Sequence, residues 1–146
     1  MKDVIKQITQ KDNKAAYAKT KEIVAASEFS NDYYQYLDDF ASLLDDDNSY
    51  IRTRAFILCC SQARWDDGKI KKVLPIMVKL FNDSKPTVVR QCLEAIKEIV
   101  VHCPKLCPDI LKAIKSIDTT KYKDSMAPLI KKDIDSLIDL INTYER

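Results

Sequence analysis

The middle of the chain repeats one hydrophobic pattern at a step of 37 residues. Each copy places four apolar residues on one side of a helix, and the copies are Tyr36, Leu37, Phe40 and Leu43, then Val73, Leu74, Met77 and Leu80, then Ile110, Leu111, Ile114 and Ile117. A period of this length is typical of two-helix units, which bury their apolar face only by stacking on a neighbour. The repeat therefore predicts an all-α, elongated stack with one continuous core.

The rest of the composition agrees with helices and excludes several other classes. One glycine and five prolines among 146 residues leave little room for β-hairpins or phosphate-binding loops. The net charge of +2 is too small to indicate nucleic-acid binding by itself. The start, Met1 to Val4, is not typical of a secretory signal, and no apolar run is long enough to span a membrane. An odd number of cysteines, five, favours reduced thiols, so we expect a cytoplasmic protein without membrane contact.

The repeat divides the chain into about four antiparallel helix pairs, in a single domain of residues 1–146. The first pair lacks the 37-residue match, so it is expected to cap the stack. The second pair is predicted over 31–65 and the third over 69–102, with turns at 45–49 and 82–86 and a second helix over 88–101 in the third pair. The fourth begins near Pro108 and breaks at 118–120, and its long last helix is expected to cover the open end.

Individual residues predict details of these helices. Asn48 or Ser49 is expected to cap the second helix of the second pair, and Pro86 suits a first helical turn. Pro75 falls inside an apolar stripe and predicts a local bend. Trp65, the single tryptophan, is expected to fill the contact between repeats.

The second helices of the two middle pairs open in the same way. Each follows an acidic turn, which contains Asp46 or Asp83, and the two openings read Ile51-Arg52-Thr53-Arg54-Ala55 and Val89-Arg90-Gln91-Cys92-Leu93. This arrangement resembles the HEAT-repeat signature over about residues 31–117. The resemblance implies an α-α superhelix whose second helices line the concave face. The fourth pair departs from it, because Tyr122-Lys123-Asp124 stands where the hydrophobic-arginine step belongs.

A narrower resemblance covers most of the chain. The strings at 48–54, 63–66, 85–87, 90–92 and 123–126 are similar to those of small bacterial HEAT-repeat proteins, which are sometimes labelled SufBD-like after iron–sulfur assembly proteins. This resemblance implies the same fold and no particular activity.

Basic and aromatic residues gather where successive second helices begin, and they are the candidate binding residues of the concave face: Tyr50, Arg52, Arg54, Lys85, Arg90, Tyr122 and Lys123. One hypothesis is a groove for phosphate, nucleic acid or an acidic peptide. The other is structural: Arg52 and Arg90 pair with the turn aspartates Asp46 and Asp83 of neighbouring units. Arg54, Lys85 and Lys123 have no repeated acidic partner, so the groove hypothesis depends on them.

Metal and catalytic chemistry are poorly represented. His102, Cys103 and Cys107 lie close together, but they supply only three ligands, and there is no C-x-x-C pair to complete a zinc or iron–sulfur site. An EF-hand reading from Asp45 places Tyr50 and Phe56 where glycine and glutamate belong. With a single histidine, options for proton transfer are few. We expect no metal, no cofactor and no enzymatic activity, and we expect the cysteines to pack in the core.

These observations lead to a ranked interpretation of function. The first hypothesis is a non-enzymatic interaction module, or scaffold, that presents a concave helical surface to a protein or peptide. The alternative is a nucleic-acid or phosphate-binding module that uses the basic groove. A second alternative is a protein related to iron–sulfur cluster assembly, acting through the cysteines.

Overall fold

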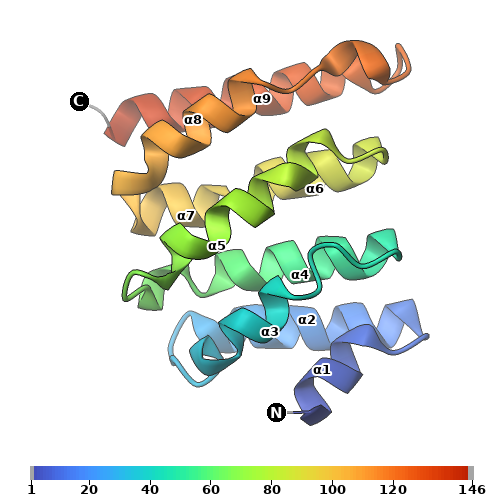
Figure 1. Ribbon diagram of the computed structural model, residues 1–146, viewed down its shortest axis with the longest axis vertical. Coiled ribbons are helices and arrows are strands. Elements are labelled where there is room, and N and C mark those ends of the chain that lie inside the picture. The colour runs from blue at the N-terminus through green and yellow to red at the C-terminus, as the bar shows by residue number, and fades with distance from the viewer. Residues whose placement is uncertain (1, 145–146) are drawn as a thin grey trace.

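A computed structural model describes residues 2–144, and all regular secondary structure in that range is helical (Figure 1). The helices form four pairs that stack in chain order, from the N-terminal pair at one end to the C-terminal pair at the other. In Figure 1 the first helices of the pairs face the viewer and the second helices lie behind them. The predicted all-α solenoid is therefore confirmed.

The first and second pairs have these elements: α1 (Lys2–Thr9), α2 (Asn13–Ser27), the 3-10 helix η1 (Tyr34–Tyr36), α3 (Leu37–Ala41), α4 (Ser49–Ser61) and η2 (Ala63–Trp65). The third and fourth pairs have these: α5 (Lys69–Met77), η3 (Val78–Asn82), α6 (Pro86–Ala95), α7 (Lys97–His102), η4 (Pro104–Leu106), α8 (Cys107–Lys115), η5 (Thr119–Lys121) and α9 (Ala127–Tyr144).

The 37-residue repeat marks equivalent positions on the first helices. Phe40 on α3, Met77 on α5 and Ile114 on α8 are all fully buried. Leu37 and Leu74 are buried as well, whereas Leu111 is half-buried. Buried apolar residues form one cluster that reaches from Ile8 to Ile141, so the units share a continuous core.

The second helices make the most extensive contacts between units. Helix α4 packs against α2 on one side and α6 on the other, and α6 packs in turn against α9. Because α4 has neighbours on both sides and α3 beneath it, its residues from Thr53 to Phe56 are all buried. Helix α9 also contacts α7 and α8, so it covers the C-terminal end of the stack as predicted.

Two helices begin at polar side chains that cap them, and the cap of α4 was expected from the sequence. The Oδ1 of Asp12 accepts a hydrogen bond from the backbone N–H of Ala15 at the start of α2. The Oδ1 of Asn48 accepts one from Tyr50 at the start of α4, so Asn48 rather than Ser49 is the cap. Pro86 begins α6, as expected.

Two helices differ from the expected outline. The second helix of the third pair, predicted to run unbroken over 88–101, divides at Ile96 into α6 and α7. The helix divides here because the carbonyl of Ile96 accepts a hydrogen bond from Ile99 as well as from Val100, and the bond from Ile99 is of the 3-10 type. Pro75 lies inside α5 and has no N–H to donate, and the chain changes to 3-10 geometry soon after it, at Val78. The bend at Pro75 stays a prediction.

None of the helices between residues 2 and 144 is long and apolar enough to cross a membrane.

Candidate functional site

The turns between the two helices of a pair share one local geometry. In the second, third and fourth pairs, an aspartate Oδ1 accepts a hydrogen bond from the backbone N–H two residues later: Asp46 from Asn48 at 2.8 Å, Asp83 from Lys85 at 2.9 Å and Asp118 from Thr120 at 3.0 Å. Aspartate favours such turns because its short side chain reaches its own backbone. These turns bring the first residues of successive second helices to the same side of the stack (Figure 1).

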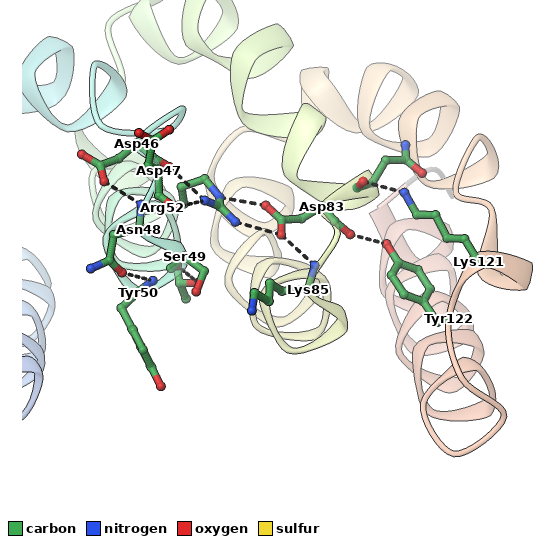
Figure 2. A network of polar contacts seen from close by, with 12 residues as sticks. Asp46, Asp47, Asn48, Ser49, Tyr50, Arg52, Asp83, Lys85, Lys121 and Tyr122 are labelled. Carbon is green, nitrogen blue, oxygen red and sulfur yellow. Dashed lines mark hydrogen bonds and ion pairs between the residues drawn. The ribbon is translucent and has the colours of Figure 1, made fainter.

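Arg52 connects the turn of the second pair to that of the third (Figure 2). Its Nε and Nη2 donate to the two carboxylate oxygens of Asp83, at 2.9 and 3.1 Å. Its Nη1 donates to the backbone carbonyls of Asp46 and Asp47, at 2.9 and 3.0 Å. Only 15% of the Arg52 side chain and 8% of the Asp83 side chain are exposed, so this ion pair is largely desolvated. Arg52 therefore acts as an internal tie, and these bonds use four of its five N–H groups within the chain.

The fourth pair contacts the same turn from the other side (Figure 2). The hydroxyl of Tyr122 donates to the carbonyl of Asp83 at 2.6 Å, and Nζ of Lys121 donates to the carbonyl of Asn82 at 2.5 Å. Tyr122 is buried, and burial raises the pKa of its hydroxyl, with Asp83 adding to the effect. Asp46, Arg52, Asp83, Lys121 and Tyr122, which we call the turn ladder, thus join three successive turns. The expectation that Tyr122 lies open in a groove was wrong, because its hydroxyl satisfies the carbonyl of Asp83.

The structural hypothesis for the arginines is confirmed for Arg52 and wrong for Arg90. Arg52 pairs with a turn aspartate of the next unit. Arg90, on α6, pairs instead with Asp133 on α9: its Nε and Nη2 donate to Oδ2 at 2.7 Å and to Oδ1 at 3.3 Å. This hydrogen-bonded pair raises the pKa of Arg90. The reason is the packing of α9 along α6, which brings Asp133 to Arg90. No sequence signal singled out Asp133, because it lies outside the repeated pattern.

Arg54 lies in a different environment from the one predicted. It was expected in an open groove, but only 4% of it is exposed, because α4 is packed between α2 and α6. Its Nη1 makes a long hydrogen bond of 3.4 Å to Oδ1 of Asn13 on α2. Its Nε and Nη2 are buried and have no hydrogen-bond partner among residues 2–144. Burial lowers the pKa of Arg54.

Arg54 lines a cavity of about 450 Å³ on the second-helix layer, which we call the Arg54 pocket. Its walls come from α2, α4 and α6, and they are formed by Asn13, Lys14, Tyr17, Tyr50, Thr53, Arg54, Ile57 and Gln91. Lys14 and Arg54 are the charged residues of this wall, so the pocket is electropositive. Tyr17 and Tyr50 are exposed at 48% and 62%, respectively. Sequence reasoning found Tyr50 and Arg54 but missed Asn13, Lys14 and Tyr17, because the first pair lacks the 37-residue match.

The other predicted binding residues do not join this pocket. The side chains of Lys85 and Lys123 are exposed. Of the seven candidates, then, Arg52, Arg90 and Tyr122 have partners within the chain, and Tyr50 and Arg54 share the pocket. Lys85 and Lys123 remain as solvent-facing charges of the predicted groove.

A second cavity, of about 650 Å³, lies on the first-helix layer between α5, η3 and α8. Its lining includes the apolar Leu74, Pro75 and Val78 and the charged Lys71, Lys79, Lys112 and Asp109. Its lining includes none of the buried polar atoms without a partner in residues 2–144. It therefore gives no indication of what it would hold.

The cysteines are packed in the core. All five are buried thiols outside any disulfide. Sγ of Cys103 lies 3.5 Å from the carbonyl of Ala63 and 3.6 Å from Oδ2 of Asp66, and burial together with Asp66 raises the pKa of Cys103 to about 12. His102 lies in the last turn of α7, with Nε2 3.3 Å from a carboxylate oxygen of Glu98. The described residues contain no group of three His, Cys, Asp or Glu side chains arranged to hold a metal ion.

Trp65 connects the first two units. Its Nε1 donates to the carbonyl of Ser27, the last residue of α2, at 2.7 Å. The side chain is half-buried. It therefore lies in the contact between repeats, where the sequence predicted it.

Residues 23–144, most of the chain, match the family model described as Cnd1, non-SMC mitotic condensation complex subunit 1. No curated protein and no solved structure matches the chain significantly. The family match agrees with the stacked helix pairs and supports a HEAT-repeat-type protein. It gives no support to the narrower SufBD-like resemblance or to a bacterial origin. The chain belongs to the Cnd1 family of condensation complex subunits.

Proposed function

We propose that this chain is a non-enzymatic interaction module that binds a protein or peptide partner on its second-helix layer. The observation that carries this proposal is the pair of exposed tyrosines, Tyr17 on α2 and Tyr50 on α4, beside the Arg54 pocket. Tyrosine presents a large rigid surface with a polar tip, and tyrosines are enriched among the residues that dominate binding energy at interfaces. Two of them at the edge of one hollow form a surface suited to a peptide.

The family supports assembly with other proteins. Its description is that of a subunit of a complex, and a subunit needs surfaces that contact other chains. The single domain of residues 1–146 and the cytoplasmic location are part of this proposal.

The two alternative functions are less well supported by the described side chains. A basic groove for nucleic acid or phosphate was expected to include Arg52 and Arg90, whose Nε and Nη2 now bind Asp83 and Asp133. The basic residues that remain for such a groove are Lys85 and Lys123, which are exposed, and Arg54, which is buried. Iron–sulfur assembly rests on cysteines that are all buried. Neither hypothesis has an observation that favours it over a peptide-binding surface.

Selection of displayed random peptides on the immobilised protein tests the proposal. We expect enriched peptides to bind the wild-type protein in solution, and Tyr17→Ser and Tyr50→Ser each to weaken binding by about tenfold, the typical loss for an interfacial tyrosine. Tyr144→Ser is the matched control, because Tyr144 is exposed at the far end of α9. Peptides whose affinity is unchanged by both test variants, or no enriched peptides at all, would contradict the proposed surface.

A further inference from the structure

Three arginines on the second-helix layer, Arg52, Arg54 and Arg90, can be compared through the same two donor atoms, Nε and Nη2. In two of these arginines the two atoms bind a carboxylate. Arg52 uses Nε and Nη2 to bind both oxygens of Asp83, and Arg90 uses the same two atoms to bind both oxygens of Asp133. This side-on arrangement matches the two oxygens of a carboxylate. In Arg54 the same two atoms, Nε and Nη2, have no partner among residues 2–144.

The described residues around Arg54 do not provide a negative charge for its guanidinium. A buried guanidinium without a counter-charge is costly, because burial removes its hydration. The one hydrogen bond that its guanidinium makes within residues 2–144, to Asn13, is long and goes to a neutral amide. The eight lining residues of the Arg54 pocket include no carboxylate, and Lys14 adds a second positive charge. The site therefore lacks the anion that its two neighbours on the same layer obtain from within the chain.

The pocket has room for an external group. Its volume of about 450 Å³ lies in the range of ligand-binding cavities, and a carboxylate on a short stem fills only part of it. Nε and Nη2 are covered in this structure, so a ligand reaches them only when the side chains that cover them move. Lys14, Tyr17 and Tyr50 at the rim are exposed, and exposed side chains change rotamer on a picosecond to nanosecond timescale.

We propose that the Arg54 pocket binds an aspartate or glutamate side chain of the partner, with both carboxylate oxygens held by Nε and Nη2 of Arg54. Tyr17 and Tyr50 then contact the apolar part of the same partner segment, and Lys14 supplies the second positive charge. A carboxylate is favoured over a phosphate group because the chain's two other Nε/Nη2 pairs already bind carboxylates with the same geometry. The identity of the partner segment rests on the proposed function, whereas the carboxylate site is testable without a partner.

The direct test is a titration with N-acetyl-aspartate methylamide, followed by the Nε–Hε signal of Arg54 in proton–nitrogen NMR spectra at constant ionic strength. We expect a saturable shift of this signal. The neutral isostere N-acetyl-asparagine methylamide should produce none. Arg54→Lys retains the charge but lacks the paired donors, so the saturable response of the rim signals of Lys14 and Tyr50 should disappear in that variant. No response of wild-type protein to the aspartate probe, or a saturable response only to inorganic phosphate, would overturn the proposal.

Thermal unfolding gives a second, independent readout. Arg54→Met removes a buried charge that has no counter-charge, so its unfolding midpoint without ligand should equal or exceed that of wild type. Arg52→Met is the matched comparison, and its midpoint should fall, because it leaves Asp83 buried without its arginine. A fall for Arg54→Met as large as that for Arg52→Met would show that Arg54 has its partners within the chain.

The two proposals fail in different ways. Binding of the aspartate probe at Arg54 without any selected peptide leaves the carboxylate site in place and removes the partner. Selected peptides that depend on Tyr17 and Tyr50 but bind Arg54→Met as tightly as wild type leave the interaction surface in place and remove the carboxylate site. In the positive case, Asp→Asn or Glu→Gln in the peptide should weaken binding to wild type by about tenfold and leave binding to Arg54→Met unchanged.

Discussion

Arg52, Arg54 and Arg90 all lie near the start of a second helix, but their side chains lie in three different environments. Arg52 holds a largely buried aspartate, Arg90 holds a more exposed one, and Arg54 is buried with its Nε and Nη2 unpaired in the described part of the chain. The local sequence predicted the tie made by Arg52, because an acidic turn recurs one repeat later. It could not predict Asp133 or Asn13 as partners, since both lie in the terminal pairs, where the repeat is weak and the packing of α9 and α2 decides which side chains meet.

Removal of Arg52 should destabilise the fold strongly. Arg52→Met leaves the Asp83 carboxylate and the carbonyls of Asp46 and Asp47 without their donors, and breaking a buried ion pair from one side costs about 3–5 kcal/mol. Urea unfolding at neutral pH measures the loss. Arg52→Lys should recover only part of the stability, because an ammonium cannot make both bonds to Asp83 and still reach two carbonyls.

Two arginine variants calibrate this prediction. Arg90→Met should cost about 1 kcal/mol or less, because 39% of the Arg90 side chain and 25% of Asp133 are exposed and solvent screens the pair. Arg64→Met, at an exposed position, should change stability by no more than about 0.5 kcal/mol. If Arg52→Met were no more destabilising than Arg90→Met, the turn ladder would have no special part in holding the units together.

At the scale of single helices, the sequence predicted where helices start better than it predicted where they break or change to 3-10 geometry. Asn48 and Pro86 indicated where α4 and α6 begin, because caps and helix-starting prolines act through local backbone chemistry. The 3-10 segments η1 to η5 and the division at Ile96 were not foreseen. Both geometries bury almost the same apolar positions, so the hydrophobic pattern does not distinguish them.

The two middle second helices allow a controlled test of capping. Asn48 precedes α4 and caps it through its side chain, whereas Lys85 precedes α6 and its side chain makes no cap. Asn48→Ala should therefore lower the free energy of unfolding by about 1 kcal/mol. Lys85→Ala, at the equivalent position, should change it by less than about 0.5 kcal/mol. Equal losses in the two variants, measured by urea unfolding, would mean that the bond from Asn48 to Tyr50 contributes nothing specific.

At the scale of the whole molecule, the 37-residue period was sufficient to predict the order of the stack and its continuous core. Each unit needs its neighbour to bury its apolar face, and that requirement is visible in sequence. The pocket at Arg54 was not predicted, because it depends on how α2 from the unmatched first pair lies against α4 and α6. Side chains that meet across units are set by the superhelix, which one sequence period does not specify.

The same architecture predicts the order in which the helix pairs unfold locally, and alkylation of the buried cysteines can measure that order. Only the thiolate reacts with an alkylating reagent, and burial raises the pKa of Cys59, Cys60 and Cys92 above the ordinary thiol value and that of Cys103 to about 12. Labelling at pH 8 therefore requires local or global opening. In a stack held together by nearest neighbours, end units open more easily than central ones.

Cys107 on α8, in the last pair, should therefore react before Cys59 and Cys60 on α4, which has neighbours on both sides. In iodoacetamide with subdenaturing urea we expect the rates, read by mass spectrometry of peptides, to differ by about tenfold, which corresponds to about 1.4 kcal/mol in opening free energy. Labelling in full denaturant supplies the intrinsic rates for normalisation. Identical normalised rates at Cys59, Cys60 and Cys107 would show instead that all pairs unfold as one cooperative unit, in which contact between units outweighs the stability of each.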